Sequence, residues 1–420
     1  MIVFNIPKLL KIWAKIESLY FKEPQLNCIV PNSSSKEFRI LFDGNDSPQK
    51  LIHSLLHHQI PQITVLRKSQ TSDEWFVAAE SRPAIPDPYI FVRSFHVSTH
   101  KISLLLKRSE NIASGAKYVP NITDTPPHIS IFLITKFVIS GVFHKIYSLL
   151  KSRCYRYDHW QMGISNKQLS KIDILHPAQN VLQADPFLWQ THDNLIHIFF
   201  ESMPYATNKG VINYTSYAPM TGECGPQKTV LERPYHLSFP FLFKYENNIF
   251  MIPETGQNRT IEIYKSSHFP DQWELFHTAM DNVIANDTVL YHDGKMWWLF
   301  TSIGEDGQKN WDELSLFYSD SPFGTWAPHP QNPIKSDCTS ARMAGNIFTD
   351  NQGRLIRPAQ DCTHGYGVAV HFCQIKVLTP QNYQEEIIDT IVPPNGYTGL
   401  HTWNQIGNTT IIDMKKVQKI

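Results

Sequence analysis

The stretch QADPFLWQTHDNLIHIFFES (residues 183–202) contains two short apolar runs separated by a polar turn, with an acid near each end. This pattern is typical of a β-hairpin that contributes to a core. Related hairpins follow as SFPFLFKYENNIFMIPET (238–255), NDTVLYHDGKMWWLFTS (286–302), AGNIFTDNQGRLIRPAQ (344–360) and LHTWNQIGNTTIIDM (400–414). A hairpin that recurs in this way indicates a repeat fold.

The spacing of the hairpins predicts the kind of repeat. Their first strands open at Asp185, Phe239, Asp287, Gly345 and His401, which gives steps of 54, 48, 58 and 56 residues. Such steps suit the four-stranded blades of a β-propeller. Only a short tail follows the fifth hairpin, so we expect DHWQMGIS (157–164) to supply a strand there and close the ring. The sequence predicts a mainly β fold, with a five-bladed β-propeller over 155–420.

Residues 1–150 follow another pattern and predict a small α/β domain. Strands are expected at 38–44, 63–68 and 89–97, and helices at 47–59, 1–20 and 129–150. The helices at 1–20 and 129–150 look amphipathic. The most apolar window, 129–143, is short for a membrane span and contains Lys136.

Composition narrows the partners. Lys+Arg and Asp+Glu are both 38, so no nucleic-acid partner is predicted. Six scattered cysteines suggest reduced thiols in a cytoplasmic protein. The sequence leaves open whether the helices predicted at 1–20 and 129–150 attach the protein to the inner membrane surface. It also leaves the oligomeric state open. Neither a metal nor a cofactor is predicted, because the sequence has no H-E-x-x-H motif or Cys/His cluster.

The first strands of a propeller line its central channel, which would bring Asp185 and Asp287 toward one axis. Each of them also has a purely structural explanation, since Asp commonly accepts hydrogen bonds from backbone N–H groups in turns. Two acids at equivalent positions of different blades favour chemistry over turn formation.

The motif A-D-P-F, followed by an aromatic-rich second strand, resembles the five-bladed propeller glycosidases of the arabinanase and β-xylosidase type. More closely, ADPFLW, YHLSFPFLF, IPET, WWLFTS, SDSPFGTWAPHPQNPI and GRLIRPAQDC, in this order, resemble the N-terminal domain family of glucosamine inositolphosphorylceramide transferase and its bacterial relatives. The region 38–150 resembles a degenerate formyltransferase-like domain without its Asn-His-Asp set.

The resemblance to the glycosidases implies roles for particular residues. Asp185 matches their catalytic base, and Asp287 matches the acid that orients the base. The acid expected on the fourth blade is missing, because Gly345 stands there. Glu254 or Glu201, each at the end of a second strand, is a candidate for a relocated acid.

Alternatively, the leaving group is a phosphate or nucleotide, which departs without protonation and needs positive charge. Arg342 and Arg357 are then the candidates for binding a sugar-nucleotide donor. His236 and His401, next to opening strands, are further candidates for substrate binding.

The resemblance implies a carbohydrate-active protein. We expect a glycosyltransferase-type enzyme of bacterial surface polysaccharide or glycolipid assembly, with an Asp base in the channel and a carbohydrate or sugar-nucleotide substrate. The alternatives are a glycoside hydrolase with a relocated acid and a non-catalytic propeller that binds a glycan or a protein.

Overall fold

The computed structural model describes residues 2–21, 29–30, 37–110, 112, 117–118, 127–166, 169, 171–175, 180–191, 194–304 and 311–419. The chain divides into two compact units. The N-terminal unit comprises Met1–Cys154 with Thr363–Gly365, and the second unit comprises Tyr155–Cys362 with Tyr366–Ile420. The fold is mainly β.

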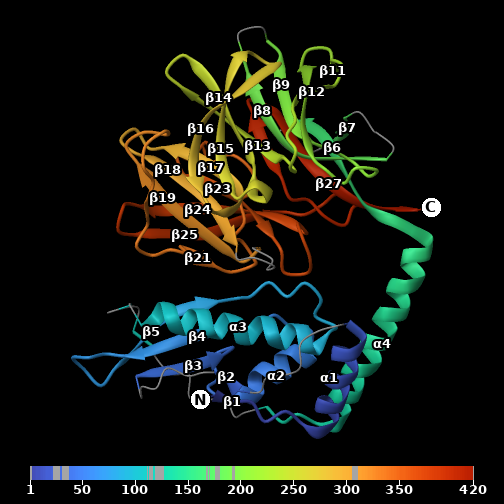
Figure 1. The fold of residues 1–420 in the computed structure, drawn as a ribbon, viewed down its shortest axis with the longest axis vertical. Helices are drawn as coiled ribbons and strands as arrows, with labels where there is room; N and C mark the ends of the chain where they lie inside the picture. The colour runs from blue at the N-terminus through green and yellow to red at the C-terminus, as the bar shows by residue number, and fades with distance from the viewer. Residues whose placement is uncertain are drawn as a thin grey trace. The chain divides into compact units, whose positions relative to one another are not determined.

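Antiparallel sheets build the second unit (Figure 1). Three of them follow one another along the chain and hold consecutive strands. The first has β8 (Val181–Gln190), β9 (Ile196–Pro204), β10 (Val211–Ala218), β11 (Glu223–Cys224) and β12 (Lys228–Leu231). The second has β13 (Ser238–Tyr245), β14 (Asn248–Glu254), β15 (Thr260–His268) and β16 (Gln272–Asp281), with the 3-10 helix η1 (Gly256–Asn258) between β14 and β15. The third has β17 (Ile284–His292), β18 (Trp297–Gly304), β19 (Glu313–Ser319), β20 (Ala327–Pro328) and β21 (Lys335–Ser336).

Two more sheets complete this unit in the part of the chain that is described. The fourth has β22 (Phe348–Thr349), β23 (Leu355–Asp361), β24 (Ala369–Leu378) and β25 (Tyr383–Ile391). The fifth combines distant segments, in the order β26 (Trp403–Ile406), β27 (Thr409–Lys419), β6 (Tyr155–Asn166) and β7 (Asp173–Ile174). Ile412 of β27 pairs with Gly163 of β6, which confirms the predicted strand at 157–164.

Contacts between the openings of the hairpins link successive sheets. The Phe239 N–H donates to Asp185, and Arg342 contacts Asp287. The Trp403 N–H donates to the Ala344 carbonyl at 2.8 Å. The circuit returns to the first sheet, where the Asn404 amide donates to the Pro186 carbonyl at 2.8 Å. This is the arrangement of a β-propeller, and we call this part of the chain the propeller unit.

The residues that open the first strands share an unusual backbone. φ is +52° at Asp185, +45° at Phe239 and +51° at Asp287, and the pairing register shifts at each of these places. These are β-bulges, which re-aim side chains and are common next to active sites. Asp tolerates a positive φ better than most residues, so the local backbone is one reason for the two acids.

The core of the propeller unit is rich in aromatic rings. Phe187 and Phe239, from neighbouring sheets, meet edge to face with ring centroids 4.8 Å apart. Both are fully buried, as is Trp298. Edge-to-face rings add to the stabilisation that burial of their area supplies.

The N-terminal unit contains an antiparallel sheet in the order β3, β4, β5. Its elements are β1 (Ile2–Val3), α1 (Lys8–Phe21), β2 (Ile29–Val30), β3 (Phe38–Phe42), α2 (Pro48–Leu56), β4 (Ile63–Lys68), β5 (Trp75–Ser81), α3 (Phe91–Ser109) and α4 (Ile131–Cys154). Ser47 caps α2 by accepting from the Gln49 N–H. The structure confirms the predicted helices at 47–59 and 129–150 and the strands at 38–44 and 63–68. The helix predicted at 1–20 is confirmed from Lys8 onward, whereas Ile2–Val3 is a strand.

The predicted strand at 89–97 is wrong, because this segment belongs to helix α3. Phe91, Val92 and Phe95 are buried, and the buried positions continue with helical spacing to Ile102 and Leu105. The expectation of a strand rested on β-branched and aromatic residues. The longer helical period and its burial override that preference.

The fourth sheet encloses a buried ion pair. The Arg357 guanidinium donates to Glu385 at 2.6 and 2.8 Å and to the carbonyls of Ser340 and Ala341. Its side chain is 0% exposed, and Lys335 also contacts Glu385, at 2.7 Å. The structure therefore corrects the prediction that Arg357 binds substrate, since its donors serve the interior of one sheet.

This ion pair makes stability depend on pH. Burial would raise the pKa of Glu385, but Arg357 and Lys335 outweigh it and lower the pKa from 4.5 to about 2. A depressed carboxyl pKa contributes stability that is complete above pH 4.5 and is lost as the pH falls toward 2. We expect roughly 3 kcal/mol of the free energy of unfolding to disappear over this interval. Urea unfolding of the wild type and of Glu385→Gln at pH 6, 4 and 3 measures it. This account would be refuted if the free energy of unfolding of the wild type fell no more steeply with decreasing pH than that of Glu385→Gln.

Candidate active site

A pocket of about 200 Å³ opens where the first strands of the propeller unit begin. Its lining combines acids, bases and aromatic rings, namely Trp160, Leu182, Ala184, Asp185, Glu201, His236, Ser238, Glu254, Arg342, Tyr366 and His401. A larger cavity of about 670 Å³, between the fourth and fifth sheets, contains none of the predicted site residues. The smaller pocket is the candidate site because titratable groups converge there.

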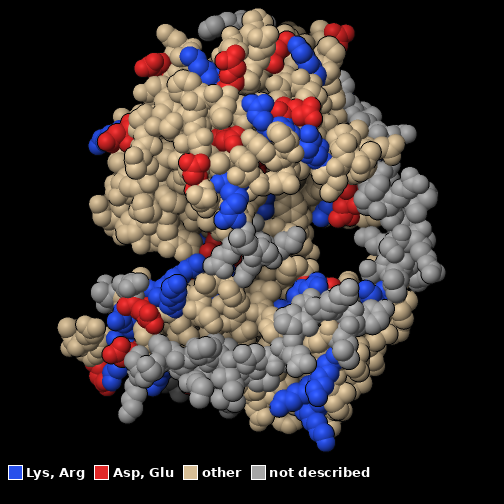
Figure 2. Space-filling model, viewed as in Figure 1, with Lys and Arg blue, Asp and Glu red and all other residues tan. Residues whose placement is uncertain are grey.

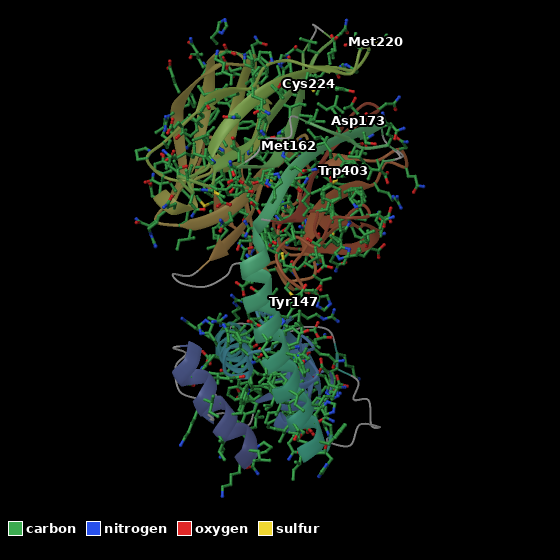
Figure 3. The ribbon with its side chains drawn as sticks, turned by 90° about the vertical axis from the view of Figure 1, so that its right-hand side faces the viewer. Tyr147, Met162, Asp173, Met220, Cys224 and Trp403 are labelled. Carbon is green, nitrogen blue, oxygen red and sulfur yellow. The ribbon has the colours of Figure 1, made fainter. Side chains whose placement is uncertain are left out.

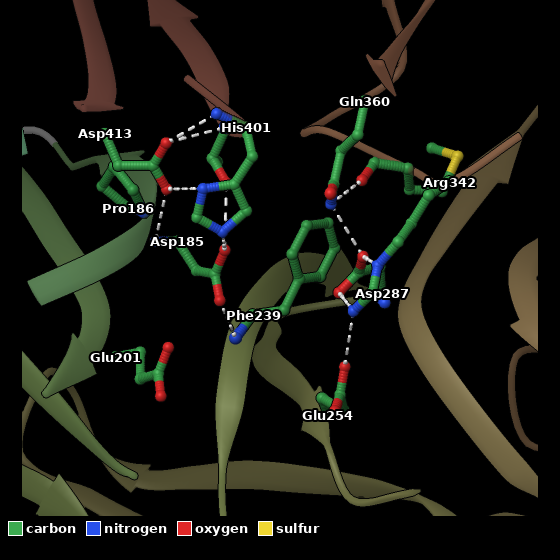
Figure 4. Close-up of polar contacts among 12 residues, drawn as sticks. Asp185, Pro186, Glu201, Phe239, Glu254, Asp287, Arg342, Gln360, His401 and Asp413 are labelled. Carbon is green, nitrogen blue, oxygen red and sulfur yellow. Dashed lines mark hydrogen bonds and ion pairs between the residues drawn. The ribbon is translucent and has the colours of Figure 1, made fainter. Parts of the chain in front are cut away.

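One side of the pocket is a chain of three charged groups (Figure 4). The Asp413 carboxylate lies 2.9 Å from His401 Nδ1, and His401 Nε2 lies 3.0 Å from Asp185 Oδ1. Asp413 also accepts the backbone N–H groups of Asp185, His401 and Thr402. Asp185 accepts from the Thr402 hydroxyl at 3.0 Å and from the Phe239 N–H at 3.2 Å.

This arrangement keeps His401 protonated and Asp185 ionised. Burial acts against both charges, yet the carboxylates of Asp413 and Asp185 raise the pKa of His401 to about 10. Burial also acts to raise the pKa of Asp185, but His401 and the Thr402 hydrogen bond hold it below its usual range. An ionised, oriented carboxylate is what a general base or nucleophile requires.

Glu201 has the opposite character. It ends the inner run of β9 and is 7% exposed, and burial raises its pKa above the usual range. Its Oε1 lies 3.2 Å from His236 Nε2, and the Gly210 N–H donates to His236 Nδ1 at 2.9 Å. Because Nδ1 accepts that bond, His236 presents an N–H to Glu201 from its other nitrogen. That N–H lowers the pKa of Glu201, but burial outweighs it, so Glu201 holds a proton more tightly than an exposed glutamate does.

The far side of the pocket is organised by Arg342. It contacts Asp287 through two guanidinium nitrogens, the second at 3.3 Å, and lies 3.6 Å from Glu254. Burial raises the pKa of Asp287 to about 7 although Arg342 lowers it, and the guanidinium contacts both oxygens of the Asp287 carboxyl group. Gln360 also donates to Asp287, at 2.9 Å.

The structure brings most of the predicted site residues together. Six of the eight line the pocket, and they are Asp185, Glu201, His236, Glu254, Arg342 and His401. Asp287 is buried behind Arg342, and Arg357 lies elsewhere in the fourth sheet. Asp287 is thus placed to orient Arg342 rather than to touch a substrate.

Gly345 explains why the fourth sheet has no acid at its opening. Its φ is +147°, and a Cβ there would lie 2.1 Å from the Trp403 carbonyl oxygen. No side chain fits this close approach of two strands. An acidic side chain therefore cannot stand at this position.

Several site residues are absent from the sequence-based prediction. They are Asp413, Thr402, Gln360, Trp160 and Tyr366. A signal existed for two of them, because Gln360 and Asp413 end the second strands of the fourth and fifth hairpins, as Glu201 and Glu254 do in the first and second.

Asp185, His401 and Asp413 each offer one ligand atom, and these atoms lie within 4.8 Å of one another. This donor set could hold a metal ion. However, both imidazole nitrogens already face carboxylates, and a ligating histidine must be neutral. The raised pKa of His401 favours an imidazolium bridging two carboxylates.

A buried imidazolium predicts behaviour at alkaline pH. A raised histidine pKa contributes stability that is complete below pH 6.5 and is lost as the pH rises through about 10. We expect NMR to show both His401 nitrogens protonated at pH 8, and urea unfolding to show stability falling between pH 7 and 10. His401→Gln should flatten that decline. A titration of His401 near pH 6.5 would contradict the ion chain.

Solved structures with some similarity include glycoside hydrolases. A family 117 glycoside hydrolase from Zobellia galactanivorans is 12% identical with a TM-score of 0.41, covering 61% of this chain and 90% of that chain. The α-L-arabinanase of Cellvibrio cellulosa is 13% identical with a TM-score of 0.37, covering 49% and 77%.

Two plant relatives share more sequence, and both are named Glucosamine inositolphosphorylceramide transferase 1. The protein from Oryza sativa subsp. japonica is 35% identical over 224 residues, which is 53% of this chain and 30% of the relative. The protein from Arabidopsis thaliana is 32% identical over 225 residues, or 53% and 29%. This chain therefore matches less than a third of the length of either relative.

The family model described as "Glucosamine inositolphosphorylceramide transferase 1, N-terminal" matches residues 168–419. The match covers more than half of the chain and includes the pocket residues from Leu182 to His401. The chain therefore belongs to the family of Glucosamine inositolphosphorylceramide transferase 1 N-terminal domains.

Proposed function

We propose that the propeller unit is a carbohydrate-active enzyme that acts on a glycosidic bond, with Asp185 as the base and Glu201 as the acid. One observation carries the proposal. Two carboxyl groups line the same pocket, and their surroundings move their pKa values in opposite directions. Such divergence is how enzymes assign base and acid roles to two similar groups.

In the proposed reaction Asp185 takes a proton from the attacking hydroxyl, while Glu201 gives its proton to the departing glycosidic oxygen. His401 and Thr402 hold the Asp185 carboxylate in position. The pocket of about 200 Å³ is smaller than the roughly 300–1,000 Å³ of pockets that hold drug-sized ligands, so we expect a single sugar ring.

The charge of the pocket supports a glycoside donor over a sugar nucleotide. Arg342 is the one Lys or Arg among the described lining residues. It already contacts Asp287 and Glu254, and the His401 imidazolium lies between two carboxylates, so little positive charge is left for phosphates. Of the two schemes that the sequence suggested, this arrangement supports the relocated acid.

Transfer to an acceptor hydroxyl instead of water is the second candidate, and the family name and its relatives favour it. The same base and acid serve both outcomes. We propose an amino sugar as the transferred unit, since the acidic pocket would stabilise an ammonium group, and a surface polysaccharide or glycolipid as its setting. We further propose that the sheets form one closed five-bladed propeller and that the N-terminal unit is a small, degenerate formyltransferase-like α/β domain.

The test uses two substrate panels, one of aryl and natural glycosides and one of sugar nucleotides with alcohol acceptors. We expect turnover of glycosides, reduced about 10²–10⁴-fold in Asp185→Asn. Glu201→Gln should lose natural glycosides but retain aryl glycosides, whose leaving groups depart without a proton. It should also lose the alkaline limb of the pH profile.

Glu232→Gln, an exposed acid paired with Lys209, is the matched control and should behave as the wild type. Turnover of sugar nucleotides alone would favour a phosphate leaving group. Binding without turnover on both panels would favour the non-catalytic propeller and overturn the proposal.

A further inference from the structure

Two helices of the N-terminal unit carry an unusual amount of exposed apolar surface. Among the described residues, fifteen large hydrophobic side chains are exposed, and ten of them lie on α1 and α4. They are Leu9, Ile12, Ile16, Ile131, Phe132, Ile139, Val142, Phe143, Ile146 and Tyr147. Such concentrated exposure marks an interaction surface, whereas single exposed residues need no explanation.

On α1 the exposed apolar residues form a stripe. Leu9, Ile12 and Ile16 share one face by helical spacing, while Leu10 and Ala14 on another face are buried in the core. The helix thus presents two apolar faces, and only one of them has a partner within the described chain. The exposed stripe therefore has no role in the packing of the unit.

On α4 the exposed face is wider. Phe132 is 78% exposed and Phe143 is 67% exposed, whereas Leu133, Ile134 and Phe137 on the opposite face are buried. The helices α1 and α4 contact each other. Figure 3 shows them on the same side of the N-terminal unit, with Tyr147 labelled near the end of α4. The two exposed faces therefore belong to neighbouring helices of one unit.

The charges beside this face are basic. Lys8, Lys11 and Lys15 follow the α1 stripe with the same spacing, and Lys136 lies on the exposed side of α4. Figure 2 shows the blue side chains over α1. The acid of α1, Glu17, is 2% exposed and caps α3 through the Phe91 and Val92 N–H groups, and the α4 sequence has no acid.

We propose that α1 and α4 form a docking surface for an anionic lipid bilayer, with the apolar side chains in the interface and the lysines against the headgroups. Amphipathic helices with lysines beside an apolar face bind membranes in this way. None of the described helices is long and apolar enough to span a bilayer. The proposal is therefore one of surface binding, and it does not depend on the proposed function of the pocket.

The test is co-sedimentation of the full chain with vesicles of phosphatidylcholine alone or mixed 3:1 with phosphatidylglycerol. We expect binding to the mixed vesicles, at least tenfold weaker to the neutral ones, and weakened by 0.5 M NaCl. Phe132→Ser/Phe143→Ser and, separately, Lys11→Glu/Lys15→Glu should each reduce binding at least tenfold. These side chains are exposed, so circular dichroism should show folded proteins.

Met220→Ser/Val392→Ser is the matched control, because Met220 is 93% exposed and Val392 67% exposed on the propeller unit. This control and Asp185→Asn should bind as the wild type does, which separates failure here from failure of the proposed chemistry. Equal binding to both vesicle types, or unchanged binding of Phe132→Ser/Phe143→Ser, would overturn the proposal. A second outcome would also overturn it: the wild type does not bind vesicles and forms a dimer in sedimentation equilibrium, and Phe132→Ser/Phe143→Ser dissociates this dimer. A second copy of the chain would then cover the exposed face.

Discussion

The buried imidazolium of His401, held between the carboxylates of Asp413 and Asp185, ties the fifth sheet of the propeller unit to the first. Each of these three charges alone would be costly to remove from water. Together they compensate one another, and backbone N–H groups satisfy the remaining carboxylate oxygens. The fold and the chemistry of the pocket share this one set of contacts, because the same ions that join the sheets also keep Asp185 ionised.

The pKa of Glu201 is shifted in the opposite direction to that of Asp185. Its neighbour His236 lies 3.2 Å away and lowers the pKa of Glu201, but the effect of burial is larger. Burial then controls the proton affinity of Glu201. Asp185 and Glu201 thus acquire different proton affinities through their partners and their burial, which residue type alone does not reveal.

The sequence was informative where a physical pattern repeats. The five hairpins and the closing strand at 157–164 follow from alternation and spacing. The same spacing predicted that Asp185 and Asp287 converge, but only Asp185 lines the pocket. The sequence was not informative where the outcome depends on long-range packing. Arg357 is buried in an ion pair with Glu385, which lies on another strand. The segment 89–97 is helical because of the core that it faces. Asp413 ends the second strand of its hairpin as Glu201 does, but its role depends on contacts with His401 and Asp185 from other segments.

The pairing of β27 with β6 has a consequence for biosynthesis. Asp413 and Asp185 are 228 residues apart, so this contact cannot hold Asp185 in place until both residues have left the ribosome. A nascent chain that ends before β27 carries four sheets with an unpaired β6 edge, and loop closure over such a distance adds an entropic barrier. The pocket therefore matures only after β27 has been synthesised, and strand edges that stay exposed until then can be bound by chaperones.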